Sequence, residues 1–168
     1  VWMILIGFTS GMNLHAQNNI DSTFKTLPYI SFQQNSGDFI LAKDGSVVPL
    51  ILDKNDYPGV IRVAGHLQND LLMVTGSLPE IVTGELPKTR GAVIIGTLGK
   101  SKLINDLVKA GKIKVDDVQG RWEVSLLQVV NNPFPGIDQA LVIVGSDKRG
   151  TIFGMFDLSA QIGVSPWY

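Results

Sequence analysis

Two short runs made wholly of apolar residues and glycine constrain this chain most. Residues 92–96 read AVIIG and residues 140–145 read ALVIVG. A strand with one face in water alternates apolar and polar residues, so a run without alternation predicts a strand buried on both faces. Such strands need helices on each side of their sheet. The sequence therefore predicts an α/β domain.

Three helices are expected, and each follows a residue that suits a helix N-terminus. They are expected to begin near Pro58, Lys102 and Arg149, with Asp56, Ser101 and Asp147 as their caps. Glycine provides a stop after each of them, at positions 76, 111 and 163. For the last helix, roughly 149–162, the spacing predicts a buried face of Ile152, Met155, Phe156 and Ile162.

The remaining strands come from a hairpin and from one β-favouring stretch. Residues 39–43 and 47–52 flank the pair Asp44-Gly45, which is a strong hairpin signal. Pro49 places its strand at an edge or breaks the ladder there. Residues 122–130 favour a strand and precede a turn at 131–136. The predicted fold is a mixed β-sheet with helices packed on it, in the order β-β-α-β-α-β-β-α.

Composition excludes several classes of function. The chain has 168 residues, which suits one domain, and a net charge of −1 without a visible basic patch, so nucleic acid is not expected as a partner. The absence of cysteine excludes disulfides, thiolate nucleophiles and thiolate metal sites.

The first residues resemble an export signal whose basic start is missing. An apolar core at 2–8 is followed by a small residue, Ala16, and then by a polar stretch that begins at Gln17. The apolar run is too short to span a bilayer, and the alternative is a buried first strand. We expect a signal peptide at 1–16, an N-terminal segment at 17–36, a domain at 37–168, and a secreted or periplasmic protein.

Searches for catalytic chemistry name no active site in the chain. The loop GTLGKS at 96–101 resembles a phosphate-binding loop, but Ile94 stands where the pattern needs glycine. His66 is the only histidine after residue 16 and lies in a predicted helix, so no metal site is expected. Carboxylates are present, but their spacing ranks no pair above another as acid and base. No cofactor is expected.

Three stretches of the chain have the order and spacing of one known family. They are GVIRVAGHLQND at 59–70 with 74–76, IIGTLGKS at 94–101 with 120–123, and GSDKRGTIFGMFDLS at 145–159 with 162–168. Together they resemble the N-terminal region of family 115 glycoside hydrolases. The third is the most specific of the three. A looser form of it resembles the accessory domain that precedes the barrel in hexosaminidases and other α-glucuronidases.

The resemblance implies a function for a longer protein. Family 115 enzymes remove glucuronic or 4-O-methylglucuronic acid side groups from xylan with inversion, using carboxylates of a (β/α)₈ barrel that follows this region. The expected partners are that downstream barrel and glucuronic acid substrates derived from xylan. No catalytic residue is carried over onto this sequence, and the isolated chain is expected to be inactive.

Lys148 and Arg149 are the candidate substrate-proximal residues. They begin the last helix just after a buried strand, at the edge where open α/β sheets bind ligands. Helix N-termini favour anions, and a uronic acid carries a carboxylate. The alternative is an ion pair with the barrel, or a solvated turn.

Two other functions compete with the accessory domain. A carbohydrate-binding module that works alone displays exposed aromatic rings to sugars, whereas Trp122, Phe153 and Phe156 are expected here to pack inside the protein. A small nucleotide-binding α/β domain is disfavoured by Ile94.

Overall fold

The computed structural model describes residues 4–6, 14–15, 28–33 and 37–164. Within the expected signal peptide, only Ile4–Ile6 and Leu14–His15 are described, and their backbones form strands β1 and β2. The expected cleavage point after Ala16 lies outside the described residues, so the export signal and the boundaries drawn from it stay predictions.

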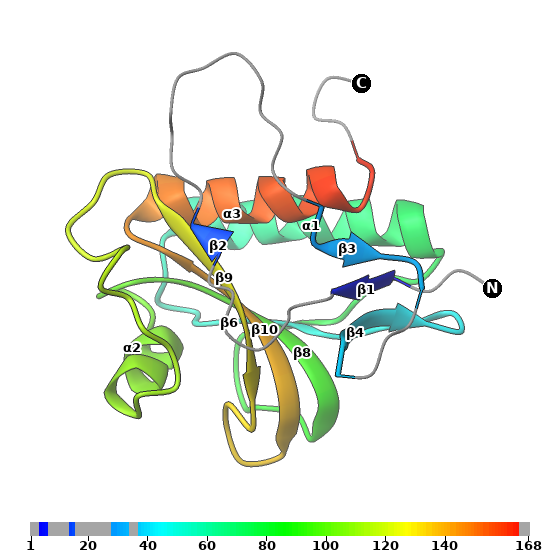
Figure 1. The fold of residues 1–168 in the computed structure, drawn as a ribbon, viewed down its shortest axis with the longest axis horizontal. Helices are drawn as coiled ribbons and strands as arrows, with labels where there is room; N and C mark the ends of the chain where they lie inside the picture. Colours follow the sequence, from blue (N-terminus) through cyan, green and yellow to red (C-terminus); the bar gives the residue numbers. More distant parts are fainter. Residues whose placement is uncertain (1–3, 7–13, 16–27, 34–36, 165–168) are drawn as a thin grey trace.

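A six-stranded mixed sheet forms the centre of the domain (Figure 1). Its strand order is β2-β9-β10-β8-β6-β7. The bounds are β6 Leu50–Leu52, β7 Ile81–Val82, β8 Thr89–Thr97, β9 Ser125–Asn131 and β10 Ile137–Gly145. Strands β10, β8, β6 and β7 run parallel, while β9 is antiparallel to β10 and to β2. The predicted mixed sheet is confirmed.

The two apolar runs are the central strands β8 and β10, as predicted. Ala140 lies opposite Ala92 in the ladder, and the register continues to Gly145 opposite Thr97. Successive residues alternate between two cores: Leu141 and Ile143 face one, whereas Ala140, Val142 and Val144 face the other. Both faces of the sheet are therefore covered, which explains why neither run contains a polar residue.

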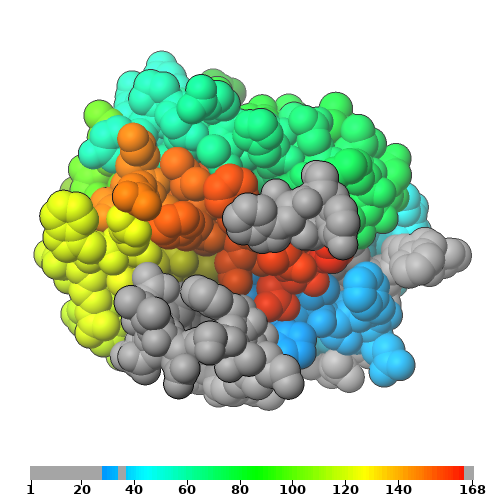
Figure 2. Space-filling model, turned by 90° about the horizontal axis from the view of Figure 1, so that it is seen from above, coloured from blue at the N-terminus to red at the C-terminus, as the bar shows by residue number. Residues whose placement is uncertain are grey.

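Helices cover the two faces of this sheet. Helix α1 (Pro58–Thr75) and helix α3 (Lys148–Gln161) lie side by side on one face, and α2 (Lys102–Lys109) lies on the other (Figure 1). From above, α3 occupies the middle of the helical face and α1 borders it (Figure 2). Among the described residues, no helix has the length and apolar character that crossing a membrane requires.

The predicted hairpin is present but shorter than expected. Strand β4 (Phe39–Lys43) turns through Asp44 and Gly45, both with positive φ, into β5 (Ser46–Val47). They belong to a second, four-stranded sheet of order β3-β1-β4-β5, with β3 at Ile30–Ser31. After Pro49 the chain enters β6 of the larger sheet, so the ladder breaks there as predicted.

Two of the three predicted helix caps are confirmed. The Ser101 hydroxyl accepts from the Ile104 amide, and the Asp147 carboxylate accepts from the Gly150 amide. The Asp56 prediction is wrong, because α1 has Tyr57 as its N-cap residue and no side chain caps it. Asp56 is buried one residue earlier, where its oxygens accept from the amides of Tyr57 and Thr97.

The predicted buried face of the last helix needs correction. Met155 and Ile162 are buried as expected and Ile152 is partly buried, but Phe156 is 41% exposed. The inner face is built instead from small residues with Met155 and Leu158, the small ones being Gly150, Thr151, Gly154 and Ser159. Gly154 has no room for a side chain, since an added Cβ would lie 2.7 Å from Ile143 Cγ2. The small residues bring α3 close to the sheet and turn its phenylalanines outward.

Candidate functional site

Three parallel strands, β6, β8 and β10, end at one edge of the large sheet, and each leads into a helix. The N-termini of α1, α2 and α3 therefore meet along this edge. In open α/β sheets this is the edge at which ligands bind.

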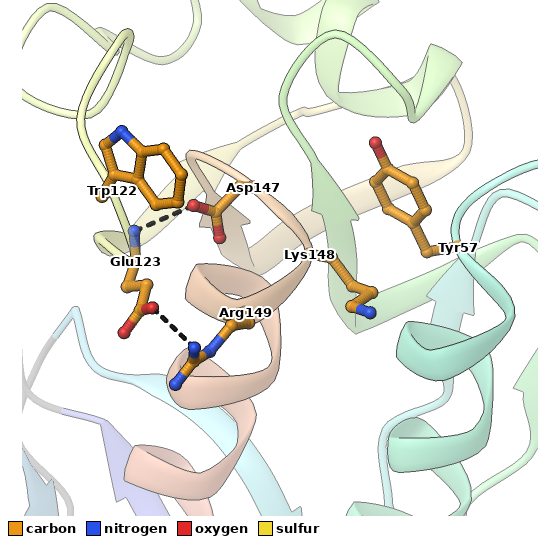
Figure 3. Close-up of a pocket in the computed structure, with 6 residues that line it drawn as sticks. All are labelled: Tyr57, Trp122, Glu123, Asp147, Lys148 and Arg149. Atoms are coloured by element: carbon orange, nitrogen blue, oxygen red, sulfur yellow. Dashed lines mark hydrogen bonds and ion pairs between the residues drawn. The ribbon is translucent and has the colours of Figure 1, made fainter.

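An open hollow of about 320 Å³ lies at this edge, between the starts of α1 and α3 (Figure 3). The described residues that line it come from the N-cap of α1, the loop before β9 and the first turn of α3. They are Tyr57, Trp122, Glu123, Asp147, Lys148 and Arg149. The structure thus places both residues predicted to lie near a substrate, Lys148 and Arg149, in one hollow.

Asp147 links two of the segments that line this hollow, the loop before β9 and the first turn of α3. Its Oδ1 accepts from the Gly150 amide at 2.8 Å, and its Oδ2 accepts from the Glu123 amide at 3.0 Å. Burial opposes ionisation of this carboxyl, but the amides of Gly150, Glu123 and Arg149 outweigh it and hold its pKa below the usual range. The anion position at the start of α3 is therefore already filled by a carboxylate of the protein itself.

Glu123 joins the loop before β9 to α3. Its φ is +59°, a left-handed conformation that is uncommon for a residue with a side chain. In this conformation its amide reaches Asp147, and its Oε1 lies 3.0 Å from Arg149 Nη1 (Figure 3). Arg149 also lies over the Phe153 ring, with its Cζ 5.7 Å from the ring centroid. The Arg149 guanidinium thus has a carboxylate partner within the domain.

Lys148 differs from its neighbour. It is exposed at the start of α3, and its stem lies near α1, since a Cβ added to Gly59 would lie 3.7 Å from Lys148 Cδ. No ion pair is recorded for it among the residues that the structure describes. Of the predicted pair, Lys148 is the better placed to meet an anion from outside the domain.

The structure provides no phosphate cradle in the loop at 96–101. Every backbone amide from residue 97 to residue 102 already donates within the protein. The acceptors are Asp56 Oδ2, Gly145 O, Asn105 Oδ1, Thr97 O twice and Asp53 Oδ2. A bound phosphate needs such amides unoccupied, so the arrangement argues against nucleotide binding.

Metal binding finds no support either within the described ranges. They contain no group of three or more His, Asp or Glu side chains arranged to hold a metal ion. His66 lies in helix α1, as predicted; its side chain is exposed and does not line the hollow.

Sequence reasoning missed Trp122 as a member of this site. The indole was expected to pack inside the protein, within a strand from residue 122, but β9 begins at Ser125 and Trp122 is 85% exposed. Phe153 is 40% exposed and likewise departs from the expectation. A signal was available in Gly120, whose positive φ ends the preceding turn and leaves Trp122 in a loop.

A search of solved structures found a protein with a similar fold. The structure matches a solved structure described as a novel family GH115 4-O-methyl-α-glucuronidase with specificity for decorated arabinogalactans, at 28% sequence identity and a TM-score of 0.56. This chain is similar to one part of a family 115 glycoside hydrolase. The match covers 71% of this chain and 14% of the other, so the chain spans a small fraction of its relative's length.

The resemblance to family 115 predicted from sequence motifs is confirmed by this structural match. A scan against protein-family models and a search of the curated proteins found no match. The fold and the solved relative together describe a domain related to glycoside hydrolases, which corresponds to one part of the longer relative.

Proposed function

We propose that this chain is the N-terminal accessory domain of a secreted α-glucuronidase. The parent enzyme hydrolyses glucuronic or 4-O-methylglucuronic acid side groups with inversion, and its catalytic carboxylates lie in a barrel that follows this domain. The observation that carries the proposal is the similarity to 14% of a family GH115 α-glucuronidase at 28% identity.

The polysaccharide is the part of the proposal that the sequence and the relative describe differently. The sequence resemblance points to xylan, whereas the relative is described as specific for decorated arabinogalactans. We propose glucuronoxylan as the substrate. The polypeptide that contains this chain and its downstream sequence should therefore release the uronic acid faster from glucuronoxylan than from arabinogalactan. Chromatography of both digests measures this, and the opposite order would move the proposal to arabinogalactan.

The isolated chain is proposed to be inactive, because its carboxylates at the hollow are already engaged. Asp147 accepts from two amides and Glu123 pairs with Arg149. An inverting pair needs two carboxyl groups about 6.5–9.5 Å apart with room for a water between them. Release of uronic acid by the purified chain, free of host glycosidases, would contradict this part of the proposal.

Lys148 is proposed to lie near the uronate of the substrate. An ammonium group without an internal carboxylate partner suits an external carboxylate. In the longer polypeptide, Lys148→Ala should raise the KM for a glucuronic acid substrate several-fold and leave the unfolding temperature unchanged. Lys109→Ala, on the exposed end of α2, is the matched control. Unchanged kinetics in Lys148→Ala would leave the lysine a solvated residue.

A second candidate function, a carbohydrate-binding module, is favoured by one observation. Trp122 is 85% exposed and shares the hollow with Tyr57, and exposed aromatic rings are what such modules offer to sugars. Affinity electrophoresis of the isolated chain in gels that contain glucuronoxylan or arabinogalactan separates the two functions. Retardation that Trp122→Ala abolishes would favour the module, and migration without retardation favours the accessory domain.

A further inference from the structure

Each of the three loops at the carboxyl edge of the sheet carries an exposed lysine. Lys54 lies in the loop between β6 and α1, Lys100 in the loop between β8 and α2, and Lys148 at the start of α3 after β10. Strands β10, β8 and β6 are neighbours in the sheet, and neighbouring strands lie about 4.8 Å apart. The three loops therefore leave the sheet within about 10 Å of one another.

The acidic side chains of the same loops accept hydrogen bonds from backbone amides. Asp53 Oδ1 accepts from the Asn55 amide at 2.8 Å, and its Oδ2 accepts from the Lys102 amide at 2.7 Å. Asp56 and Asp147 are each held by two amides in the same way. Because these carboxylates are engaged inside the protein, the groups that the three loops offer to an external ligand are ammonium groups.

The three lysines lack an acidic partner within the part of the chain that the structure describes. No ion pair there joins Lys54, Lys100 or Lys148 to a carboxylate. Lys100 Nζ instead lies over the Tyr57 ring, 5.5 Å from its centroid, and Tyr57 lines the hollow together with Lys148. The Lys148 stem approaches Gly59 in the first turn of α1. Lys100 and Lys148 therefore both lie beside the start of α1, at the hollow.

The chemistry of these lysines suits a ligand with several separated carboxylates. An ammonium group on a flexible stem has three donors and pairs readily with an external carboxylate. The hollow is small for a polymer, since its volume of about 320 Å³ is near the lower end of the range of about 300–1,000 Å³ for small-molecule sites. A polysaccharide that enters it must therefore extend over the neighbouring loops, which carry Lys54 and Lys100.

We propose that Lys54 and Lys100 bind the uronates that neighbour the one at Lys148 on the same polysaccharide chain. The inference rests on the proposed function, in which Lys148 lies near the uronate of the substrate. It deepens that function by naming the substrate class as xylan that carries several uronates close together. An exposed ion pair is weak on its own, so these lysines set the preference between substrates and do not retain the polymer without the catalytic part of the enzyme.

The test compares two substrates of the longer polypeptide, glucuronoxylan and an aldouronic oligosaccharide with one uronate, with KM expressed per uronate. The double variant Lys54→Gln/Lys100→Gln should raise the KM for glucuronoxylan about threefold or more, and the KM for the oligosaccharide much less. The increase should shrink with added salt, because the Debye length falls from about 30 Å at 0.01 M to about 3 Å at 1 M. Lys88→Gln/Lys109→Gln is the matched control, because it makes the same charge change at the other ends of β8 and α2, and it should alter neither KM.

The kinetics separate failure of this inference from failure of the proposed function. An unchanged KM for glucuronoxylan, an equal increase for both substrates, or an equal increase in the control variant would each overturn the inference while the proposed function stands. If the unaltered polypeptide releases no uronic acid from either substrate, the proposed function fails and the inference fails with it. The unfolding temperatures of both variants should match that of the unaltered protein, because exposed lysines contribute little to stability, so a change in KM reports binding.

Discussion

Helices α2 and α3 cover opposite faces of the same sheet (Figure 1). They differ in which kinds of side chain they bury and which they expose. Helix α2 buries Ile104 and Leu107 and exposes Lys102 and Lys109. Helix α3 buries glycine, threonine and serine beside Met155 and Leu158, and it exposes two phenylalanines.

The comparison shows how each helix contributes to the stability of the domain. Helix α2 buries large apolar side chains and leaves its lysines in water, where desolvation costs them nothing. Helix α3 packs closely through small residues and leaves two phenylalanine rings partly in water, which reduces what these rings contribute to stability. The two helices therefore stabilise the domain in different ways.

The largest effect should come from the inner faces, where the two helices ought to behave alike. Met155→Ala in α3 and Leu107→Ala in α2 each remove a buried side chain and should each lower the free energy of unfolding by about 2–5 kcal/mol. Phe156→Ala should cost about 1 kcal/mol, since a large part of its ring is exposed in the isolated domain. Urea melts of the isolated chain measure all three. An equal loss in Phe156→Ala and Met155→Ala would restore the originally predicted inner face.

A glycine substitution tests the close approach that α3 makes to the loop before β9. Gly150→Ala places a methyl group against the Val124 carbonyl and should lower the free energy of unfolding by about 1–3 kcal/mol. Gly65→Ala is the matched control, because an added Cβ there meets nothing within 4 Å, and alanine in a helix should stabilise by about 0.5–1 kcal/mol. Melts that show no loss in Gly150→Ala would mean that α3 can move away from the loop before β9 at no cost.

These glycines also show where sequence reasoning succeeded and where it could not. Strands β8 and β10 were predictable because burial on both faces leaves no polar residue in the run. The inner face of α3 was not predictable, because apolar residues occur all around the helix and hydrophobic spacing therefore selects no face. Gly150 and Gly154 determine which face of α3 packs inward, because a side chain at either position would clash with Val124 or Ile143. These contacts join residues far apart in the sequence, so no local pattern predicts them.

The residues of the candidate site also fall into those that were predictable from local sequence and those that were not. The position of Lys148 and Arg149 at the start of α3 was predictable, because it follows from a strand, a cap and a helix, all of which are local. Trp122 was missed because β-propensity placed it in a strand, whereas the left-handed Glu123 ends the loop only through its contacts with Asp147 and Arg149. Asp56 was misplaced for the same reason, as its partner Thr97 lies 41 residues away.

Removing the helix caps should have smaller effects on stability, and the effects should differ between α3 and α2. Asp147→Ala should lower the free energy of unfolding by about 1 kcal/mol or somewhat more, because Asp147 also holds the Glu123 amide. Ser101→Ala should cost less, because its bond to Ile104 is long at 3.5 Å.

The Asp147 effect should also depend on pH. Its folded pKa lies below the ordinary value of 3.8, so its contribution is complete well above that value and is lost as the pH falls through the lower folded pKa. Denaturation at neutral pH and at several values below 3.8 checks this. A difference between Asp147→Ala and the unaltered chain that stays constant to the lowest pH would contradict the assigned role of the carboxylate.

The smallest effect is expected where each helix carries an exposed ion pair. Lys102 pairs with Asp106 on α2, and Arg149, whose side chain is 63% exposed, pairs with Glu123 at the start of α3. Exposed pairs contribute about 0–1 kcal/mol and weaken in salt, so Lys102→Ala and Arg149→Ala should each change the stability of the isolated chain little. Arg149→Ala should cost slightly more than Lys102→Ala, because Arg149 also lies over the Phe153 ring and so loses a second contact. Thermal melts of both variants at low and high salt measure the difference. A loss above about 1 kcal/mol in either variant, or a loss that does not weaken in salt, would contradict the solvated character of these pairs.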